Sequence, residues 1–110
     1  MMIDFNMLAA VTVPGMNGGQ GEMTAKMSVS EKGKIIVSQI HPGSSIGAHR
    51  HDTSDDINYV LSGQGIAVCD GREESLSPGC CHICPQGSTH SIANTGEDAL
   101  CLLTVVVERA

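Results

Sequence analysis

The stretch that decides the fold is "GAHRHDTSDDINYVLSGQG", residues 47–65, in which two of the chain's five histidines, His49 and His51, stand one residue apart. In a β-strand, residues i and i+2 project from the same face, about 6 to 7 Å apart along the backbone. We therefore expect both imidazoles to point toward one place in front of a sheet, while Arg50 points away. Neutral imidazole is the commonest metal ligand, so the pair indicates a metal site. Two solvated or hydrogen-bonded loop histidines are the alternative reading.

Short segments rich in β-branched residues surround this stretch, and turn signals separate them. The segments are "KIIVSQI" (34–40), "INYVL" (57–61), "GIAVCD" (65–70), "HSIAN" (90–94) and "LCLLTVVV" (100–107). No segment shows a convincing helical period, so the pattern predicts an all-β sandwich or barrel. The Gly-rich segment "PGMNGGQGEM" (14–23) is expected to be a mobile loop that follows an N-terminal strand.

Composition excludes several classes of partner. The chain has 110 residues, enough for one domain, and a formal net charge of −6 with only six scattered Lys and Arg residues. Nucleic acids and anionic membranes require clustered positive charge, so neither is expected as a partner. The longest apolar run, residues 99–107, is about half of what a membrane helix needs. No signal peptide is evident at the N-terminus, so we expect a cytoplasmic protein. The five cysteines are an odd number, and Cys80 and Cys81 are adjacent, which favours free thiols over a disulfide framework.

Two separated motifs give these residues a family resemblance. The first runs from Gly43 through His49, His51 and Asp56 to Gly63. The second contains Gly79, Pro85, Gly87, His90 and Asn94. Together, residues 43–63 and 79–94 resemble the two sequence motifs of the cupin superfamily. The resemblance implies a single cupin domain over residues 1–110, folded as a jelly-roll-like double-stranded β-helix barrel.

The resemblance also implies a ligand set for one divalent transition metal: His49, His51, Asp56 and His90. The metal itself stays open among iron, manganese, nickel, copper and zinc, because the same imidazole-rich set accepts each of them. The family usually has Glu where this chain has Asp56. The shorter side chain leaves two possibilities open, direct ligation or a contact with the metal through water or a histidine. Asp55 is expected to face away.

Other polar residues have more than one reading. Asn58 should share the inward face with Asp56, either near the metal or in a cross-strand hydrogen bond. His82 is a candidate for lining the pocket beside Cys84, although a hydrogen-bonded core histidine fits it better. Cys81 and Cys84 form a CxxC spacing, but positions i and i+3 of a strand face opposite sides, which disfavours redox chemistry. Cys69 and Cys101 are expected to be small core residues.

The function predicted from these observations is metal-dependent chemistry on a small molecule, with an enzyme of the dioxygenase or isomerase type as the first hypothesis. No catalytic residue beyond the ligands is identified. A non-catalytic module that binds or senses a small ligand through the metal is the alternative. No Lys or Arg can be placed inside the barrel from the sequence, so a neutral or enol-type ligand is favoured over a dicarboxylate or a sugar phosphate. We also expect a homodimer, with residues 5–13 or the C-terminal strand at the contact.

Overall fold

The computed structural model describes residues 1–109 as β-strands joined by tight turns, with two single-turn 3₁₀-helices near the N-terminus. The elements are η1 (Phe5–Met7), β1 (Val11–Pro14), η2 (Met16–Gly18), β2 (Glu22–Ser30), β3 (Gly33–Ile40), β4 (Ser45–Arg50), β5 (Ser54–Ser62), β6 (Gly65–Cys69), β7 (Arg72–Leu76), β8 (Cys81–Cys84), β9 (Thr89–Asn94) and β10 (Leu100–Glu108). The all-β prediction is confirmed.

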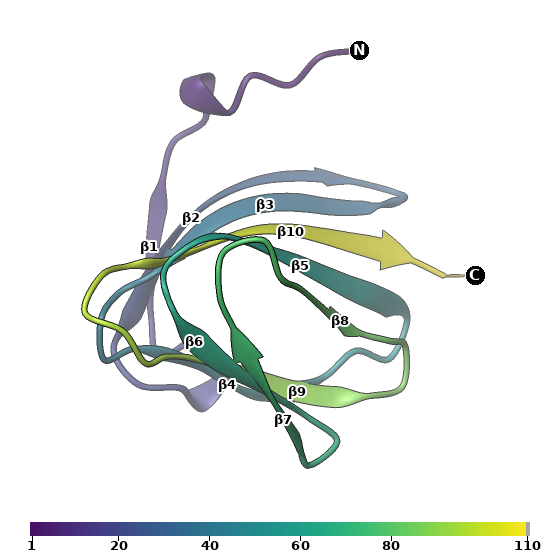
Figure 1. The fold of residues 1–110 in the computed structure, drawn as a ribbon. Helices are drawn as coiled ribbons and strands as arrows, with labels where there is room; N and C mark the ends of the chain where they lie inside the picture. Colours follow the sequence, from purple (N-terminus) through teal and green to yellow (C-terminus); the bar gives the residue numbers. More distant parts are fainter. Residues whose placement is uncertain (110) are drawn as a thin grey trace.

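The strands form two sheets that face each other (Figure 1). One has the order β1-β2-β3-β10-β5-β8 and the other the order β4-β9-β6-β7, and all of the pairings are antiparallel. The hydrogen-bonded ladders do not continue from one sheet into the other, so the barrel is not closed. The arrangement is that of a jelly roll, in which two sheets enclose the core without a continuous ring of hydrogen bonds.

The interior between the sheets follows from alternation along each strand. In β10, residues 100, 102, 104 and 106 are buried, and the residues between them are half-buried on the outer face. One part of the interior is a packed apolar core: Met23, Ile40, Val60, Ala67, Leu76, Ile92, Leu100 and Leu102. Polar side chains such as Asp56, Asn58, His82 and His90 are also buried. The polar cluster sits beside the core, and the core holds the two sheets together around it.

The Gly-rich segment, for which the sequence predicts a mobile loop, packs against the sheet. It contains η2, which packs against β4 through the close approach of Gly19 to Gly47. A Cβ atom on Gly47 would meet the backbone of Asn17, and one on Gly19 would meet the backbone of Ser45. The absence of side chains at both positions therefore lets the segment lie directly on the sheet.

The glycine and proline residues of the two motifs lie in tight turns. Gly63 and Gly79 have φ values of 93° and 91°, which residues with a Cβ atom rarely adopt. Pro85 to Ser88 form a turn, in which the Ser88 amide donates to the Pro85 carbonyl at 3.0 Å. Asn94 has a structural role, because its amide group donates to the carbonyls of Ile40 and Asp98. No helix within residues 1–109 has the length and apolar character needed to cross a membrane.

Candidate metal centre

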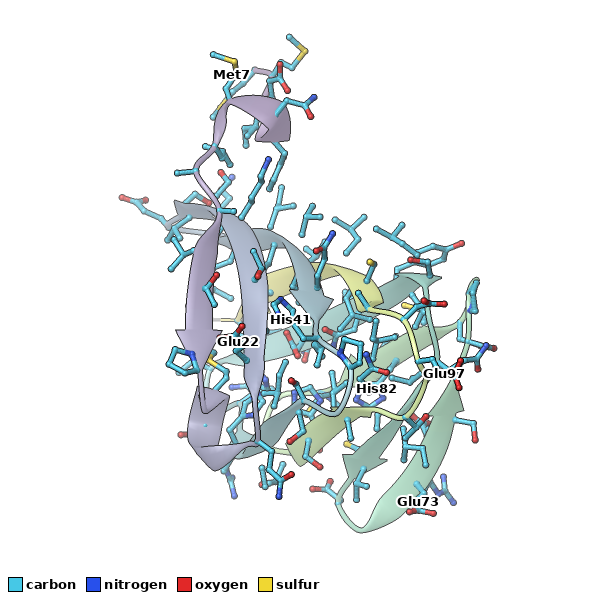
Figure 2. All side chains as sticks on the ribbon, turned by 90° about the vertical axis from the view of Figure 1, so that its left-hand side faces the viewer. Met7, Glu22, His41, Glu73, His82 and Glu97 are labelled. Carbon is cyan, nitrogen blue, oxygen red and sulfur yellow. The ribbon has the colours of Figure 1, made fainter. Side chains whose placement is uncertain are left out.

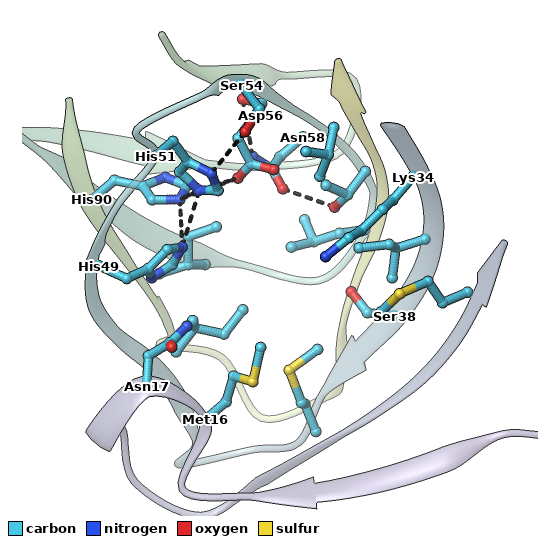
Figure 3. Close-up of a pocket in the computed structure, with 18 of the residues that line it drawn as sticks. Met16, Asn17, Lys34, Ser38, His49, His51, Ser54, Asp56, Asn58 and His90 are labelled. Carbon is cyan, nitrogen blue, oxygen red and sulfur yellow. Dashed lines mark hydrogen bonds and ion pairs between the residues drawn. The ribbon is translucent and has the colours of Figure 1, made fainter. Parts of the chain in front are cut away.

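Strands β4, β5 and β9 bring the four predicted ligands together. His49 of β4 is paired directly with His90 of β9, and a register shift in β4 precedes His49. His51 lies one residue beyond the end of β4, where its backbone exchanges hydrogen bonds with Gly87 and Ser88. Asp56 comes from β5 in the opposite sheet. Segments far apart in the sequence therefore converge on one point between the sheets, as Figure 3 shows.

The three imidazoles form a nearly equilateral arrangement. Each pair among the Nε2 atoms of His49, His51 and His90 is 3.1 Å apart. The rings are inclined to one another by 65° to 69°, so the three nitrogen atoms meet edge to edge and the rings do not stack. Three nitrogen lone pairs directed at one another at this distance repel unless a cation or protons lie between them.

The other ring nitrogen of each histidine faces away from this point. His49 Nδ1 donates to the Gly47 carbonyl at 2.8 Å, which places its proton on Nδ1 and leaves the Nε2 lone pair available. His51 Nδ1 lies 3.4 Å from the hydroxyl of Ser54. His90 Nδ1 lies 2.9 Å from Nε2 of His82. A backbone carbonyl such as that of Gly47 orients metal-binding imidazoles in known sites.

Asp56 joins the cluster through one carboxylate oxygen. Its Oδ2 atom lies 3.1 Å from His90 Nε2 and 3.4 Å from His51 Nε2. Asn58 donates to the same oxygen at 3.0 Å and accepts a hydrogen bond from the Thr104 hydroxyl at 2.8 Å. Asn58 therefore makes the cross-strand hydrogen bond of one reading, and it also lines the cavity beside the cluster. The shorter Asp side chain still brings an oxygen atom within the group of four ligand atoms.

Burial and charge act on the ionisation of the cluster. Burial alone would raise the pKa of Asp56, but the close contact of its carboxylate with His90, the hydrogen bond from Asn58 and the proximity of His51 outweigh it and lower that pKa. Burial lowers the pKa of His51, and the neighbouring His90, His49 and Lys34 act in the same direction against the opposing effect of Asp56. At neutral pH these shifts favour a charged carboxylate and a neutral imidazole, the forms that bind a cation.

The distances fit a transition metal. Three ligand atoms 3.1 Å apart and at right angles about a cation would each lie about 2.2 Å from it, against roughly 2.0 to 2.1 Å for a zinc–imidazole bond. The ligand atoms of all four residues lie within 4.8 Å of one another. The cluster could therefore hold one metal ion with little rearrangement.

The cluster opens into a cavity of about 240 Å³ between the two sheets. Its walls are mainly aliphatic and thioether side chains: Met16, Met23, Met27, Ile36, Ile46, Ile92, Leu102 and Val106. The sequence placed no Lys or Arg inside the barrel, but one exposed basic residue borders the cavity. Lys34 of β3 lines the cavity, and its ammonium group is directed into it (Figure 3). Sequence reasoning missed Lys34 because both faces of its strand carry apolar residues, so the sequence does not show which face points inward.

His82 is not among the residues, within the described range 1–109, that line this cavity. Its ring is inclined by 22° to that of His90, with 5.2 Å between the ring centroids, and the two rings meet end to end through His82 Nε2 and His90 Nδ1. His82 lies behind His90 as seen from the cavity. His82 is instead the hydrogen-bonded core histidine of the other reading. Its Nδ1 atom lies 2.6 Å from a carboxylate oxygen of Glu74, a residue that the sequence did not single out.

The cysteines show no sign of a redox pair at the CxxC spacing. Cys81 is exposed and Cys84 is buried, so the two thiols diverge as predicted, and all five cysteines are free. Burial is the main cause that raises the pKa of Cys84, to about 12, which makes its thiol unreactive. Cys69 and Cys101 are half-buried, so they are not the core residues that the sequence predicts.

Comparison with known proteins agrees with this geometry. Residues 36–106 match the family model described as "Cupin domain". An "Oxalate-binding protein" of Thermotoga maritima is 28% identical over 113 residues, which cover 97% of this chain and 93% of that protein. The crystal structure of a predicted oxalate decarboxylase from Thermotoga maritima superimposes with a TM-score of 0.91 at 28% identity, covering 98% of this chain and 99% of the other. A protein of Thermus thermophilus shares the fold, with a TM-score of 0.73 at 23% identity and coverage of 99% and 98%.

Proposed function

The chain belongs to the cupin family, and on that premise we propose that it holds one divalent transition metal and uses it to bind a small carboxylate ligand. The metal ligands in this proposal are His49, His51, His90 and Asp56. The observation that supports it best is the convergence of three Nε2 atoms and a carboxylate oxygen at the wall of a cavity. Iron, manganese, nickel, copper and zinc all accept such a ligand set.

The size and charge of the cavity support the class of ligand. Its volume is below the roughly 300 to 1,000 Å³ of typical drug-sized pockets, so a bound molecule must be small. Lys34 adds a positive charge on the wall, and an ammonium group pairs well with an oxyanion. This removes the sequence-based objection to a dicarboxylate. The names of the Thermotoga maritima relatives make oxalate the first ligand to test.

Binding and catalysis are separate parts of the proposal. Capture of the ligand needs only the metal and Lys34. A second candidate, a metal-dependent enzyme acting on the same ligand, is supported by Glu108, which lines the cavity together with Lys34 and adds a group that can exchange a proton. A decarboxylase would break the carbon–carbon bond of oxalate in a metal-dependent reaction, releasing carbon dioxide and, after one proton is taken up at the remaining carbon, formate. A binding protein would return the oxalate unchanged.

Calorimetric titration of the metal-loaded protein with oxalate, oxamate and oxamide tests the ligand class, because these molecules share a shape and carry two, one and no negative charges. We expect affinity to fall along the series.

Replacing Lys34 with Met should weaken oxalate binding about tenfold, which is the low end for a charge-assisted hydrogen bond. Lys32→Met is the matched control, since Lys32 lies in the adjacent turn and does not line the cavity. Failure of the metal-loaded protein to bind oxalate, or equal binding of oxamide, would refute the ligand class.

A second copy of the chain is the proposed partner. On the outer face of the six-stranded sheet, cross-strand pairs place Ile35, Val105, Ile57 and Ile83 in one continuous apolar row. The N-terminal arm that contains η1 extends beside this face in Figure 1, and a second cavity lies between the arm and strands β2 and β3. An apolar face bounded by an arm suits association of two copies across a two-fold axis.

Sedimentation at micromolar concentration tests this partner. The wild-type chain should sediment as a dimer, and Val105→Asp should yield monomers. A monomeric wild-type chain would refute the dimer. We also propose that the protein acts in the cytoplasm, where its five free thiols would remain reduced.

A further inference from the structure

A chain of hydrogen bonds runs from the candidate metal centre to a carboxylate at the edge of the fold. His90 Nδ1 lies 2.9 Å from His82 Nε2, and His82 Nδ1 lies 2.6 Å from Glu74 Oε1. The side chains of His82 and His90 are 0% and 1% exposed, whereas that of Glu74 is 48% exposed. The three residues come from β8, β9 and β7. The chain therefore links the buried centre to a group that contacts solvent.

The chain has only one arrangement of protons that leaves His90 able to bind a metal. A carboxylate can only accept, so the His82 nitrogen next to Glu74 must carry the proton, and Nε2 of His82 must accept. His90 then donates from Nδ1, and its Nε2 atom keeps a free lone pair. That Nε2 atom is the one that faces His49, His51 and Asp56. In metal-free protein the Asp56 carboxylate, 3.1 Å away, favours a proton on this Nε2 atom, so Glu74 acts against Asp56 through His82.

The geometry points to Glu74 as a positioning residue that, through His82, fixes the tautomer in which His90 presents Nε2 to the metal. The inference rests on the proposed function, because it assumes that His90 is one of the metal ligands. A carboxylate that holds a metal-binding imidazole is common in metal sites. Here the carboxylate acts through a second imidazole that is hydrogen-bonded to the first, so His82 and His90 both lie between Glu74 and the metal.

The burial of His82 makes Glu74 hard to replace. Water cannot easily reach the ring, so loss of the carboxylate would leave a buried N–H group without its acceptor. The amide of Glu74→Gln can either accept through its oxygen or donate through its nitrogen. When it donates, the chain reverses and His90 carries its proton on Nε2, where it cannot ligate. Glu74→Ala removes the acceptor entirely.

Glu73 supplies a matched control. It is the neighbouring residue on β7 and carries the same charge, but it pairs with Val68 on the other face of the strand and points to solvent (Figure 2). Figure 2 shows His82 within the body of the molecule, away from Glu73. Any general effect of removing one negative charge from β7 should appear in Glu73→Gln as well.

Nitrogen-15 NMR of the histidine rings reads the tautomer directly in metal-free protein at about pH 8, above the ordinary imidazole pKa of about 6.5. We expect His90 to carry its proton on Nδ1 in the wild type and in Glu73→Gln. In Glu74→Gln and Glu74→Ala, a substantial fraction should carry it on Nε2. Affinity for zinc should fall about tenfold or more in both Glu74 variants, the effect typical of residues that support a ligand.

The outcomes separate the two proposals. Wild-type protein that binds no divalent metal would refute the proposed function alone, because the tautomer is measured without metal. The inference about Glu74 is overturned if His90 carries its proton on Nε2 in the wild type. It is also overturned if both Glu74 variants keep the wild-type tautomer and the zinc affinity of Glu73→Gln.

Discussion

Removal of two of the three imidazoles should abolish stabilisation of the fold by metal. A metal that binds only the folded state stabilises it by about 2.7 kcal/mol when its free concentration is 100 times Kd. For a domain of this size, each kcal/mol raises Tm by roughly 4 to 8 °C. The Nε2 atoms of His49, His51 and His90 already lie 3.1 Å apart, so little of this energy is spent on rearrangement. We therefore expect the metal to raise Tm by on the order of 10 °C or more.

The assay is thermal unfolding of chelator-treated protein, scanned with and without each candidate metal. His49→Ala combined with His51→Ala should fold with a Tm that no longer depends on the metal. His41→Ala is the control, because His41 lies outside the cluster and contacts Thr24 and Glu22. It should keep the full metal-dependent shift. A double variant that retains the wild-type shift would refute the reasoning, as would a wild type whose Tm no first-row metal changes.

Three further predictions concern the carboxylate, the pH and the docked N-terminal segment. Asp56→Asn should weaken metal binding by about tenfold or more. Asp55→Asn is the control, because it alters an outward residue paired with Arg109, and it should leave metal binding unchanged. Equal metal affinities of the two variants by titration would show that Asp56 does not ligate. Because burial lowers the pKa of His51, the His51 imidazole is protonated in the unfolded chain before it is protonated in the folded protein as pH falls below 6.5. The stability of the metal-free protein, measured by urea unfolding, should therefore be full above pH 6.5 and decline below it. A flat profile of stability against pH across this range would contradict the lowered pKa. Gly47→Ala should lower stability by roughly 1 to 3 kcal/mol, because the new Cβ atom would meet the backbone of η2; an unchanged unfolding midpoint would show that the segment docks loosely.

The spacing of the two motifs was enough to predict the fold and the four clustered residues. His49 and His51 converge because alternation along an extended segment is a local property, and the turns at Gly63 and Gly79 require a backbone that Gly favours. His90 could be added only through the resemblance. No local rule pairs it with His49, which lies 41 residues away.

The features that sequence reasoning missed depend on contacts between distant elements. The segment "KIIVSQI" is apolar on both faces, so alternation could not decide whether Lys34 points inward or outward. Glu74 lies on an edge strand among charged residues, and only the position of His82 in the opposite sheet gives it a partner. The docking of η2 depends on the close approach of two glycines from separate segments, a contact for which composition gives no signal.

An anomalous difference map from crystals grown with the native metal tests the central claim most directly. We predict a single peak per chain, about 2.2 Å from Nε2 of each of the three histidines and within bonding reach of Asp56. A map with no peak between the imidazoles, or with its metal bound elsewhere on the chain, would contradict the account.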